Sequence, residues 1–276
     1  MTIRDGSKKV FVSVIVPTYN SARHLPACLK ALRKQKYPNI EVLVIDNYSN
    51  DETRQICETF KTKIILHRGT PAAARNAGIA HSTGNFVLFV DSDQQLGDSV
   101  IENCVSLCTT QDVDAVKIPE VFVGVNFWGK CSALWKNSMV KAWGPKGGIP
   151  RFYRKEKLLK QLVFNGDLRW WEDMELYQRL KSTGLREAWC SRKLIHNETD
   201  SPTRAVRKYT SYGKSVTAFR SRKAEAPYTA TINLSFSTLA QIPRNSGRSV
   251  SVLVGCLFLV TVKTFSAALG FLSGLR

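Results

Sequence analysis

The stretch TPAAARNAGIAHSTGNFVLFVDSD, residues 70–93, joins a helix signal to a buried-strand signal. Its first half is rich in alanine, with Pro71 at the start and Gly84 at the end, as is typical of a helix. The run NFVLFV that follows is almost entirely apolar, which is typical of a strand covered on both faces of a sheet. A helix leading directly into such a strand predicts an α/β fold.

The same alternation recurs on both sides of this stretch. Helix-like segments separate five apolar, strand-like runs at residues 11–16, 41–46, 63–68, 85–91 and 114–119. The first of these helices carries apolar residues at helical spacing after Asn20 or Ser21, either of which can cap it. This alternation predicts a mostly parallel sheet with helices on both faces and right-handed crossovers.

Polar side chains follow four of the expected strands. In such sheets, ligands bind outside the carboxyl ends of the strands. The strand ends supply Pro17-Thr18-Tyr19-Asn20, Asp46-Asn47, His67-Arg68 and Asp91-Ser92-Asp93. One crevice would therefore gather an aromatic ring, several carboxylates and a guanidinium, which suits a nucleotide. No Gly-rich phosphate loop follows any strand, so phosphates would need a metal ion and basic side chains.

The pair Asp91 and Asp93 has two interpretations. Asp and Ser favour turns because they hydrogen-bond to the nearby backbone, so a solvated turn is one reading. Two carboxylates one residue apart also suit a hard divalent cation, which prefers oxygen ligands. The motif alone favours the turn, whereas the three other polar strand ends favour the metal site.

Composition restricts the class of protein and its partners. The 276 residues suffice for one large domain or two smaller ones, and 43% of them are hydrophobic, as in globular proteins. A formal net charge of +18 favours an anionic partner. The seven cysteines follow no disulfide or zinc pattern, which predicts reduced thiols in a cytosolic compartment. The segment MTIRDGSKKVFVSVIV is not expected to be a signal peptide, because its apolar run is short and predicts a strand.

The second half of the chain is less regular. From residue 121 to 148 no element stands out, and the tryptophans there suit a core as well as a recognition surface. RFYRKEKL predicts a strand leading into a helix, and WWEDMELYQRLKSTG predicts a helix that ends near Gly184. Glu172 and Asp173 begin that helix, where the helix dipole favours negative charge.

The C-terminal third predicts contact with a membrane. The segment RAVRKYTSYGKSVTAFRSRK, residues 204–223, is basic with apolar residues at helical spacing, as in helices that lie on anionic lipid. From Ser249 an apolar run continues to the C-terminus, interrupted by Lys263, so a span, a re-entrant segment, an interfacial helix and a core helix all remain open. We expect three parts: a catalytic domain at 1–200, a basic amphipathic region at 201–248 and a membrane-associated or transmembrane segment at 249–276.

Four motifs in this order resemble family 2 glycosyltransferases of the GT-A fold. They are VSVIVPTYN, EVLVIDNYSNDET, TPAAARNAGIAHSTGNFVLFVDSD and WEDMELYQRL. The resemblance implies a Rossmann-like sheet domain that binds a nucleotide sugar.

The resemblance assigns donor-binding roles to several strand-end residues. Tyr19 and Asp46 fall where the family holds the nucleotide base, while Asn47 stands where many members have a second Asp. Arg75 matches a position that lines the nucleotide-sugar pocket. Pro17, within the first motif, is expected to contribute to the same pocket.

The resemblance also assigns the reacting end of the site. Asp91 and Asp93 match the DxD motif that bridges Mg²⁺ or Mn²⁺ to the diphosphate, with Ser92 between them in the donor site. Asp173 matches the catalytic base. His196 falls where some relatives place a residue near the metal or the diphosphate.

Together these features predict an inverting, metal-dependent glycosyltransferase. We expect a UDP-sugar as donor, with GDP- and dTDP-sugars as alternatives. The expected acceptor is a polyprenyl phosphate or lipid-linked glycan at the cytoplasmic face of the cell membrane, beside anionic lipid. No nucleic-acid partner is expected, because no recognisable reading module accompanies the charge. The alternative is a non-catalytic, basic protein on a GT-A-like scaffold that binds membrane or nucleic acid.

Overall fold

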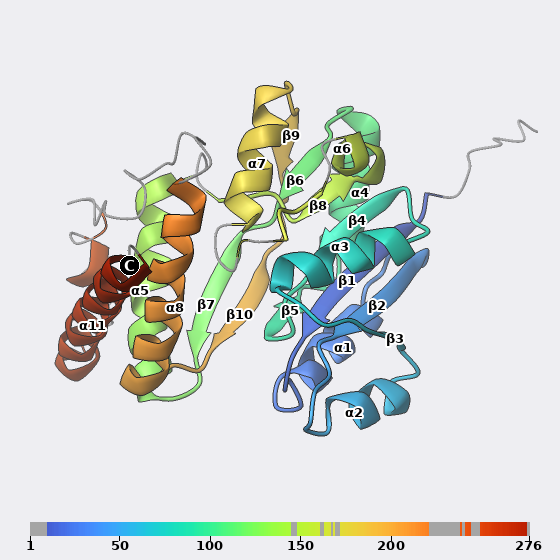
Figure 1. Ribbon diagram of the computed structural model, residues 1–276. Coiled ribbons are helices and arrows are strands. Elements are labelled where there is room, and N and C mark those ends of the chain that lie inside the picture. The colour runs from blue at the N-terminus through green and yellow to red at the C-terminus, as the bar shows by residue number, and fades with distance from the viewer. Residues whose placement is uncertain are drawn as a thin grey trace, which may run out of the picture.

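The computed structural model describes most of the chain (Figure 1). The described residues are 10–144, 148–160, 163–166, 168, 172–220, 238, 241–243 and 249–274, without the side chains of 215–220. Two expected features therefore lie partly outside the described residues. They are the amphipathic region, of which most of residues 221–248 is not described, and the WWED motif, of which residues 170 and 171 are not described.

A seven-stranded sheet forms the centre of the larger half of the molecule. In spatial order its strands are β3 (Lys63–Leu66), β2 (Ile40–Asp46), β1 (Val12–Thr18), β4 (Phe86–Phe89), β8 (Phe152–Arg154), β6 (Ala115–Lys117) and β9 (Glu187–Trp189). The pairs β3–β2, β2–β1, β1–β4 and β6–β9 are parallel. Strand β8 is antiparallel to both of its neighbours, β4 and β6. The predicted α/β fold with a mostly parallel sheet is confirmed.

Helices cover both faces of this sheet because successive strand side chains point to opposite sides. Val12, Val14 and Val16 pack on one face and Ile15 on the other. The first face is covered by α1 (Leu25–Arg33), α2 (Thr53–Thr59) and α4 (Val100–Thr110). The second face is covered by α3 (Pro71–His81), α6 (Lys155–Lys160) and α7 (Glu172–Ser182). Helix α3 begins where the sequence predicts, with Thr70 Oγ1 accepting from the Ala73 N–H at 3.2 Å.

A small second sheet continues from the carboxyl end of β4. It contains β5 (Gln94–Leu96), β10 (Leu194–Glu198) and β7 (Glu120–Gly124), with β10 in the middle. Strand β10 pairs antiparallel with β5 and parallel with β7, so that His196 lies opposite both Gln94 and Phe122. This sheet carries the residues just after the DxD motif away from the main sheet.

Three helices form a separate layer beyond the small sheet (Figure 1). They are α5 (Phe127–Trp143), α8 (Pro202–Arg220) and α11 (Val250–Gly274). The expectation of an irregular segment between residues 121 and 148 is wrong, because α5 occupies most of it. Residues 145–147, within the loop GPKGG, lie outside the description. Helix α5 has no single apolar stripe, because it packs against the small sheet and against α11 at once.

The helical layer has its own apolar core and very close backbone contacts. Cys131 and Leu134 of α5 pack with Ala205 of α8 and with Cys256 and Leu259 of α11. A Cβ atom at Gly213 of α8 would lie 2.1 Å from the carbonyl oxygen of Ala267, and one at Gly270 of α11 would lie 2.1 Å from that of Thr210. Only glycine permits this crossing.

Helix α11 is the one helix among the described residues that is long and apolar enough to cross a membrane. About a third of its most apolar window is buried against the rest of the chain. Length and composition alone do not separate a spanning helix from one that packs on a protein surface.

Candidate active site

The loops after β1 and β2 are fastened together at the edge of the main sheet. The Asn20 N–H donates to Ser49 Oγ at 2.9 Å, and the Asn50 N–H donates to Asn20 Oδ1 at 3.0 Å. Asn20 has φ 49°, a left-handed conformation that asparagine tolerates better than most residues. The loops leave the Tyr19 ring 61% exposed beside the strand ends, available for contact with a planar base.

Asp46 lies beneath this edge and is fully buried. Its carboxylate accepts from Thr18 Oγ1 at 3.3 Å and from the Ser49 N–H at 3.1 Å, and it forms an ion pair with Arg54 Nε at 3.2 Å. In this arrangement Asp46 holds the base-side loops together. Direct contact between Asp46 and a base stays a prediction.

Asn47, next in the chain, is half-buried and lies at the rim. Its side-chain amide both donates to the Gly69 carbonyl and accepts from the Gly69 N–H, each at 3.2 Å. It thereby fastens the loop before α3 to the end of β2. The site therefore presents an amide where many members of the family that the motifs resemble have a carboxylate.

Arg75 connects the two acidic motifs of the site. From α3 its guanidinium contacts Asp91 Oδ1 at 3.0 Å and Glu172 Oε1 at 2.5 Å. Its side chain is 11% exposed. These residues are far apart in the sequence, so the contact brings the DxD motif and the start of α7 into one site.

Asp91 is held by donors from three parts of the chain. Besides Arg75, Arg151 Nη1 lies 3.3 Å and Gln94 Nε2 lies 3.2 Å from Asp91 Oδ2. Gln94 also accepts from the Asp91 N–H at 3.0 Å through its side-chain oxygen. Burial acts to raise the pKa of Asp91, but Arg151 and Arg75 outweigh it and hold that pKa well below its usual range. Asp91 is thus ionised and fixed in orientation.

A chain of alternating charges runs from Arg151 to Asp93. Arg151 Nε contacts Glu120 Oε1 at 2.6 Å, Glu120 Oε2 contacts His196 Nδ1 at 3.1 Å, and His196 Nε2 contacts Asp93 Oδ1 at 3.3 Å. Burial alone would lower the pKa of His196, but hydrogen bonds to Asp93 and Glu120 raise it to about 9. Burial would raise the pKa of Glu120, but Arg151 and His196 lower it to about 2. His196 is therefore an imidazolium at neutral pH.

The first turn of α7 places one carboxylate inside the site and one at its surface. Glu172 is 7% exposed and points to Arg75; burial raises its pKa, although Arg75 opposes this. Asp173 is exposed, and its Oδ1 accepts from the Met174 N–H at 2.7 Å. The charge of Asp173 acts on Arg75 and Arg151, and also on Tyr212 of α8. Asp173 therefore borders the same cluster, on the side of the helical layer.

Most residues predicted at the reacting end come together. Arg75, Asp91, Asp93 and His196 form one contact network, with Asp173 beside it. Ser92 donates to Ser21 Oγ at 2.9 Å and so ties the DxD loop to the loop after β1. The base-side residues Pro17, Tyr19 and Asp46 lie at the ends of the neighbouring strands β1 and β2.

Sequence reasoning missed Arg151, Glu120 and the role of Gln94. Arg151 and Glu120 come at the beginning of strands, whereas the rule for parallel sheets selects residues at the ends. Gln94 directly follows the DxD motif and is completely buried. A buried amide needs partners, and here they are the N–H and Oδ2 of Asp91, with His196 Nδ1 also 3.2 Å from Gln94 Nε2. A Gln directly after the DxD motif was therefore a usable signal.

The carboxylates suit a divalent cation that is shared with a diphosphate. Among the described residues no group of three or more His, Cys, Asp or Glu side chains could enclose a metal ion. Mg²⁺ needs only one or two protein carboxylates where phosphates complete its shell. Asp93 is the more accessible of the two, with its side chain 37% exposed. His196 would have to lose a proton before it could bind a metal, so its assignment as a ligand stays a prediction.

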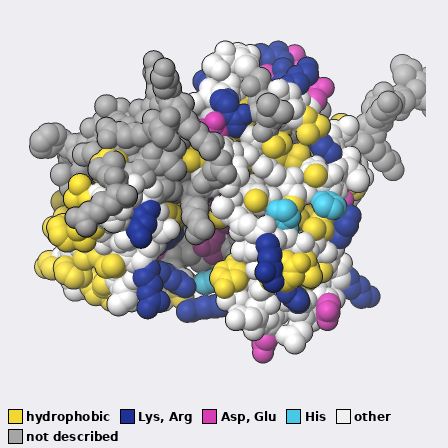
Figure 2. Space-filling view, viewed as in Figure 1, with side chains coloured by type: hydrophobic (Ala, Val, Ile, Leu, Met, Phe, Trp, Pro, Cys, Tyr) yellow, Lys and Arg dark blue, Asp and Glu magenta, His cyan; other side chains and the backbone are white. Residues whose placement is uncertain are grey.

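In Figure 2, acidic side chains lie recessed between the helical layer at the left and the sheet half at the right. The acidic cluster is therefore bordered by both halves of the molecule. Within the cluster, the cations Arg75 and Arg151 contact Asp91, so negative and positive groups alternate there.

Curated relatives match part of the chain. A glycosyltransferase, GlyG of Streptococcus pneumoniae, is 34% identical over 112 residues, which are 38% of this chain and 37% of GlyG. TarS of Staphylococcus aureus, a poly(ribitol-phosphate) β-N-acetylglucosaminyltransferase, is 34% identical over 135 residues, 46% of this chain and 23% of TarS. A PGL/p-HBAD biosynthesis glycosyltransferase of Mycobacterium bovis is 32% identical over 161 residues, 55% of this chain and 57% of that protein. Each match covers less than two thirds of the relative's own length.

Solved structures share the fold over nearly the whole chain. The mannosyltransferase PcManGT of Pyrobaculum calidifontis, in complex with GDP-Man and Mn²⁺, has a TM-score of 0.62 at 20% identity and covers 98% of this chain and 88% of its own. Residues 1–349 of S. aureus TarS, in complex with UDP-GlcNAc, have a TM-score of 0.56 at 18% identity, covering 96% and 91%. The family model for glycosyl transferase family 2 matches residues 13–168, more than half of the chain. The chain therefore belongs to glycosyltransferase family 2.

Proposed function

We propose that this protein transfers a sugar from a nucleoside diphosphate sugar to an acceptor hydroxyl or phosphate, with inversion at the anomeric carbon. The observation that carries the proposal is the contact of Arg75 with both Asp91 and Glu172. It sets the DxD motif, which suits the diphosphate end of a donor, beside the carboxylates that begin α7.

The residues of the cluster divide the chemistry between them. Breakage of the bond from sugar to diphosphate leaves negative charge on the nucleotide, and fixed cations stabilise such charge. Arg75 and Arg151 supply cations in a buried setting. A Mg²⁺ or Mn²⁺ ion held by Asp91 and Asp93 would supply further Lewis-acid stabilisation to the leaving diphosphate.

Asp173 is the proposed general base. It is exposed at the edge of the cluster, where an acceptor can approach from solvent or from the helical layer. A carboxylate on the side opposite the leaving group can take the acceptor's proton while the acceptor attacks the anomeric carbon. Glu172 forms an ion pair with Arg75, so its proposed role is to position Arg75 and not to accept the proton.

We propose a UDP-sugar as donor and a lipid-linked acceptor, either a polyprenyl phosphate or a lipid-linked glycan, at the cytoplasmic membrane face. Relatives that bind UDP-GlcNAc or GDP-Man support the donor class. Support for the acceptor comes from the apolar helix α11 and the basic helix α8, which pack against each other in the helical layer.

A thermal-shift panel tests the donor and the metal together. Purified protein is heated with UDP-, GDP- and dTDP-sugars, with and without Mn²⁺. We expect one nucleotide class to raise the melting temperature, and to raise it more with Mn²⁺, because a ligand that binds only the folded state stabilises it. No shift with any donor in either condition would contradict the proposal.

Substitution of Asp173 tests the base. Asp173→Asn keeps the shape of the side chain but cannot accept a proton, so transfer should fall by about 100-fold or more while donor binding persists. Glu175→Gln, two residues further along the same helix and paired with Arg179, is the matched control and should retain transfer. If Asp173→Asn transferred sugar at the full rate, Asp173 would not be the general base.

A further inference from the structure

Helix α11 has two apolar faces, and within the described part of the chain only one of them is covered. The covered face packs on α5 and α8 and consists of Gly255, Cys256, Leu259, Val260, Lys263, Ser266 and Gly270. The other face is 46–72% exposed and consists of Val250, Val254, Leu257, Phe258, Phe265, Leu269 and Leu272, which we call the apolar stripe. A helix turns by about 100° per residue, so the stripe occupies roughly one third of the circumference along the whole helix.

Lys263 anchors the covered face. Its Nζ lies 2.8 Å from Asp200 Oδ2 and 2.8 Å from Ser132 Oγ of α5, and 5.4 Å from the centre of the Tyr209 ring of α8. Lys263 is 4% exposed. The lysine that interrupts the apolar run is therefore the residue that fastens α11 to the protein.

This anchor is incompatible with α11 crossing a bilayer on its own. A spanning α11 would carry Lys263 into the hydrocarbon without Asp200, at a cost of several kcal/mol. It would also expose the apolar face that now covers Cys131 and Leu134. If α8 accompanied it, the exposed basic side chains of α8 would enter the hydrocarbon as well.

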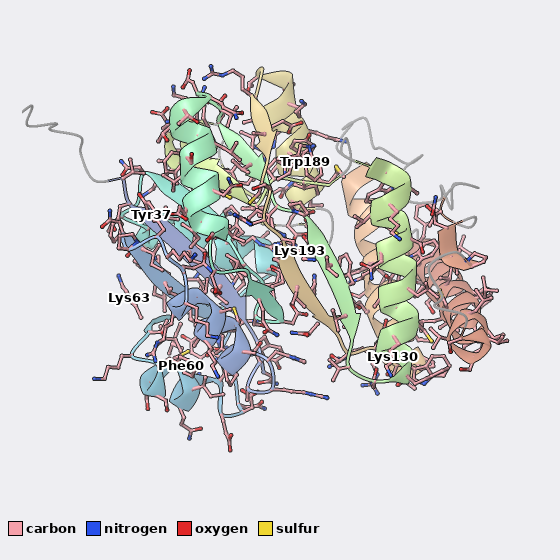
Figure 3. The ribbon with its side chains drawn as sticks, turned by 180° about the vertical axis from the view of Figure 1, so that it is seen from behind. Tyr37, Phe60, Lys63, Lys130, Trp189 and Lys193 are labelled. Carbon is pink, nitrogen blue, oxygen red and sulfur yellow. The ribbon has the colours of Figure 1, made fainter. Side chains whose placement is uncertain are left out.

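The surroundings of the stripe are basic throughout. The sequences of α5, α8 and α11 contain no Asp or Glu. Exposed basic side chains lie on α8 and α5, the helices that pack against α11: Arg204, Arg207, Lys208, Lys214 and Lys130. Figure 2 shows apolar side chains over α11 with Lys and Arg side chains beside them, and Figure 3 shows Lys130 at the end of α5.

Aromatic rings extend the stripe onto α5. The Trp128 ring lies 5.7 Å from that of Phe258 and 5.0 Å from that of Phe127, which is 44% exposed. Such rings are favoured at the boundary between lipid and water.

We propose that the apolar stripe of α11 inserts into one leaflet of an anionic lipid bilayer, with the helix axis parallel to the membrane plane and no crossing of the bilayer. An apolar face flanked by cations matches acyl chains below anionic headgroups. A second copy of the chain fits less well, because it would set one basic surface against another. The inference does not depend on sugar transfer, since lipid binding needs no donor.

Vesicle co-sedimentation tests the surface. We expect the protein to sediment with phosphatidylcholine vesicles that contain phosphatidylglycerol, and much less with phosphatidylcholine alone. Phe265→Gln combined with Leu269→Gln should reduce the partition by about tenfold, because both side chains belong to the stripe. The matched control is Leu66→Gln combined with Leu159→Gln, at exposed positions of β3 and α6, and should sediment like the unchanged protein.

Two results of the sedimentation experiment would overturn the proposal that the stripe inserts into an anionic bilayer. One is unchanged sedimentation of the stripe variant, and the other is equal binding to neutral and anionic vesicles. A third result would also overturn the proposal: the protein binds no vesicles but forms a dimer, and Phe265→Gln combined with Leu269→Gln converts the dimer to monomers. The stripe would then be the contact surface for a second copy of the chain. All stripe side chains are exposed, so the variants should melt at the same temperature as the unchanged protein, which circular dichroism checks.

Cysteine labelling tests the orientation. All seven native cysteines are buried, so a membrane-impermeant maleimide should react mainly with an introduced cysteine. Ser251→Cys and Ser273→Cys lie near opposite ends of α11, both exposed. Labelling of both from outside sealed vesicles supports the in-plane helix, whereas labelling of only one shows a span and overturns the proposal.

Discussion

Arg151 holds two carboxylates of the site at once. Its Nη1 reaches Asp91 and its Nε reaches Glu120, which in turn fixes His196. A planar guanidinium can bridge two such partners, whereas a lysine ammonium is a single point charge. The orientation of the DxD motif therefore depends on a residue outside the motif.

Substitution of this residue gives the first prediction. Arg151→Lys should lower kcat/KM for transfer by about 10- to 100-fold, with a higher Mn²⁺ concentration needed for half-maximal rate, because partners that orient ligand carboxylates act on this scale. A steady-state assay across a Mn²⁺ titration measures both effects.

The matched control is Arg186→Lys. Arg186 is 54% exposed and pairs with Asp112 at 2.8 Å and with the buried Asp114 at 3.5 Å, and neither partner belongs to the contact network of the site. It should retain activity within about twofold, since exposed ion pairs contribute little. An equal fall in kcat/KM in both variants would show a general effect of replacing arginine by lysine, and not a loss of the orientation that Arg151 gives to the site carboxylates.

The sequence predicted the site residues that follow parallel strands and missed Arg151, which precedes the antiparallel strand β8. Asp91 follows β4, and the rule for parallel sheets selects it. Arg151 reaches the same point because β8 runs antiparallel to β4, with the Phe89 N–H donating to the Arg151 carbonyl at 2.9 Å. Strand direction is a property of tertiary pairing, which local patterns do not encode.

At the scale of elements, a buried lysine joins β6, β9 and α7. Lys117 is 2% exposed, lies 3.2 Å from Glu187 Oε1 and faces the Tyr177 and Trp189 rings (Figure 3 labels Trp189). The Tyr177 hydroxyl donates to Glu187 at 2.9 Å. Burial acts to raise the pKa of Glu187, but Tyr177 and Lys117 outweigh it and lower that pKa below 4.5.

Glu187→Gln should therefore destabilise the fold by about 2 kcal/mol near pH 7, because it leaves a buried ammonium without its carboxylate. The native carboxylate has a lowered pKa, so its contribution is complete above pH 4.5 and is lost as the pH falls through the folded-state pKa. Urea unfolding at several pH values should show the difference between the two proteins shrinking in acid.

Asp112→Asn serves as the comparison. Its side chain is 71% exposed, and its loss should change the free energy of unfolding by less than about 0.5 kcal/mol. If the difference in free energy of unfolding between the unchanged protein and Glu187→Gln stayed constant down to pH 3, the carboxylate of Glu187 would not be the source of the pH dependence.

Among the helices, α1, with a single buried face, was predicted, whereas α5, which is covered on several sides, was not. Helix α1 has one buried face that carries Leu25, Leu29 and Leu32, and the helical spacing of these residues predicted the helix. Helix α5 buries Ser132 and Ser138 together with Cys131, so polar and apolar residues share its covered surface. The three-residue strand β5 is too short to show any period.

For the whole molecule, the helical layer depends on the glycine crossing between α8 and α11. Gly270→Val would place a Cβ atom 2.1 Å from the Thr210 carbonyl oxygen, so the helices must separate. We expect a loss of about 3 kcal/mol or more of stability in this layer and faster reaction of Cys131 and Cys256 with a thiol reagent. Mass spectrometry of the labelled peptides measures the second effect.

Gly166→Ala is the control for this prediction, since a Cβ atom there meets nothing within 4 Å. It should leave both stability and thiol reactivity unchanged. Slow labelling of Cys131 and Cys256 in Gly270→Val, equal to that of the unchanged protein, would show that the crossing tolerates a side chain.

The order of strands in the main sheet also has a consequence for synthesis on the ribosome. Strand β8 lies between β4 and β6, so β6 cannot join the sheet until residue 154 has emerged. Until then the nascent chain exposes the edge of β4, whose sequence FVLF is wholly apolar. Unpaired apolar edges promote aggregation. The interval between the emergence of residue 90 and that of residue 154 is therefore the one in which this apolar edge is unpaired.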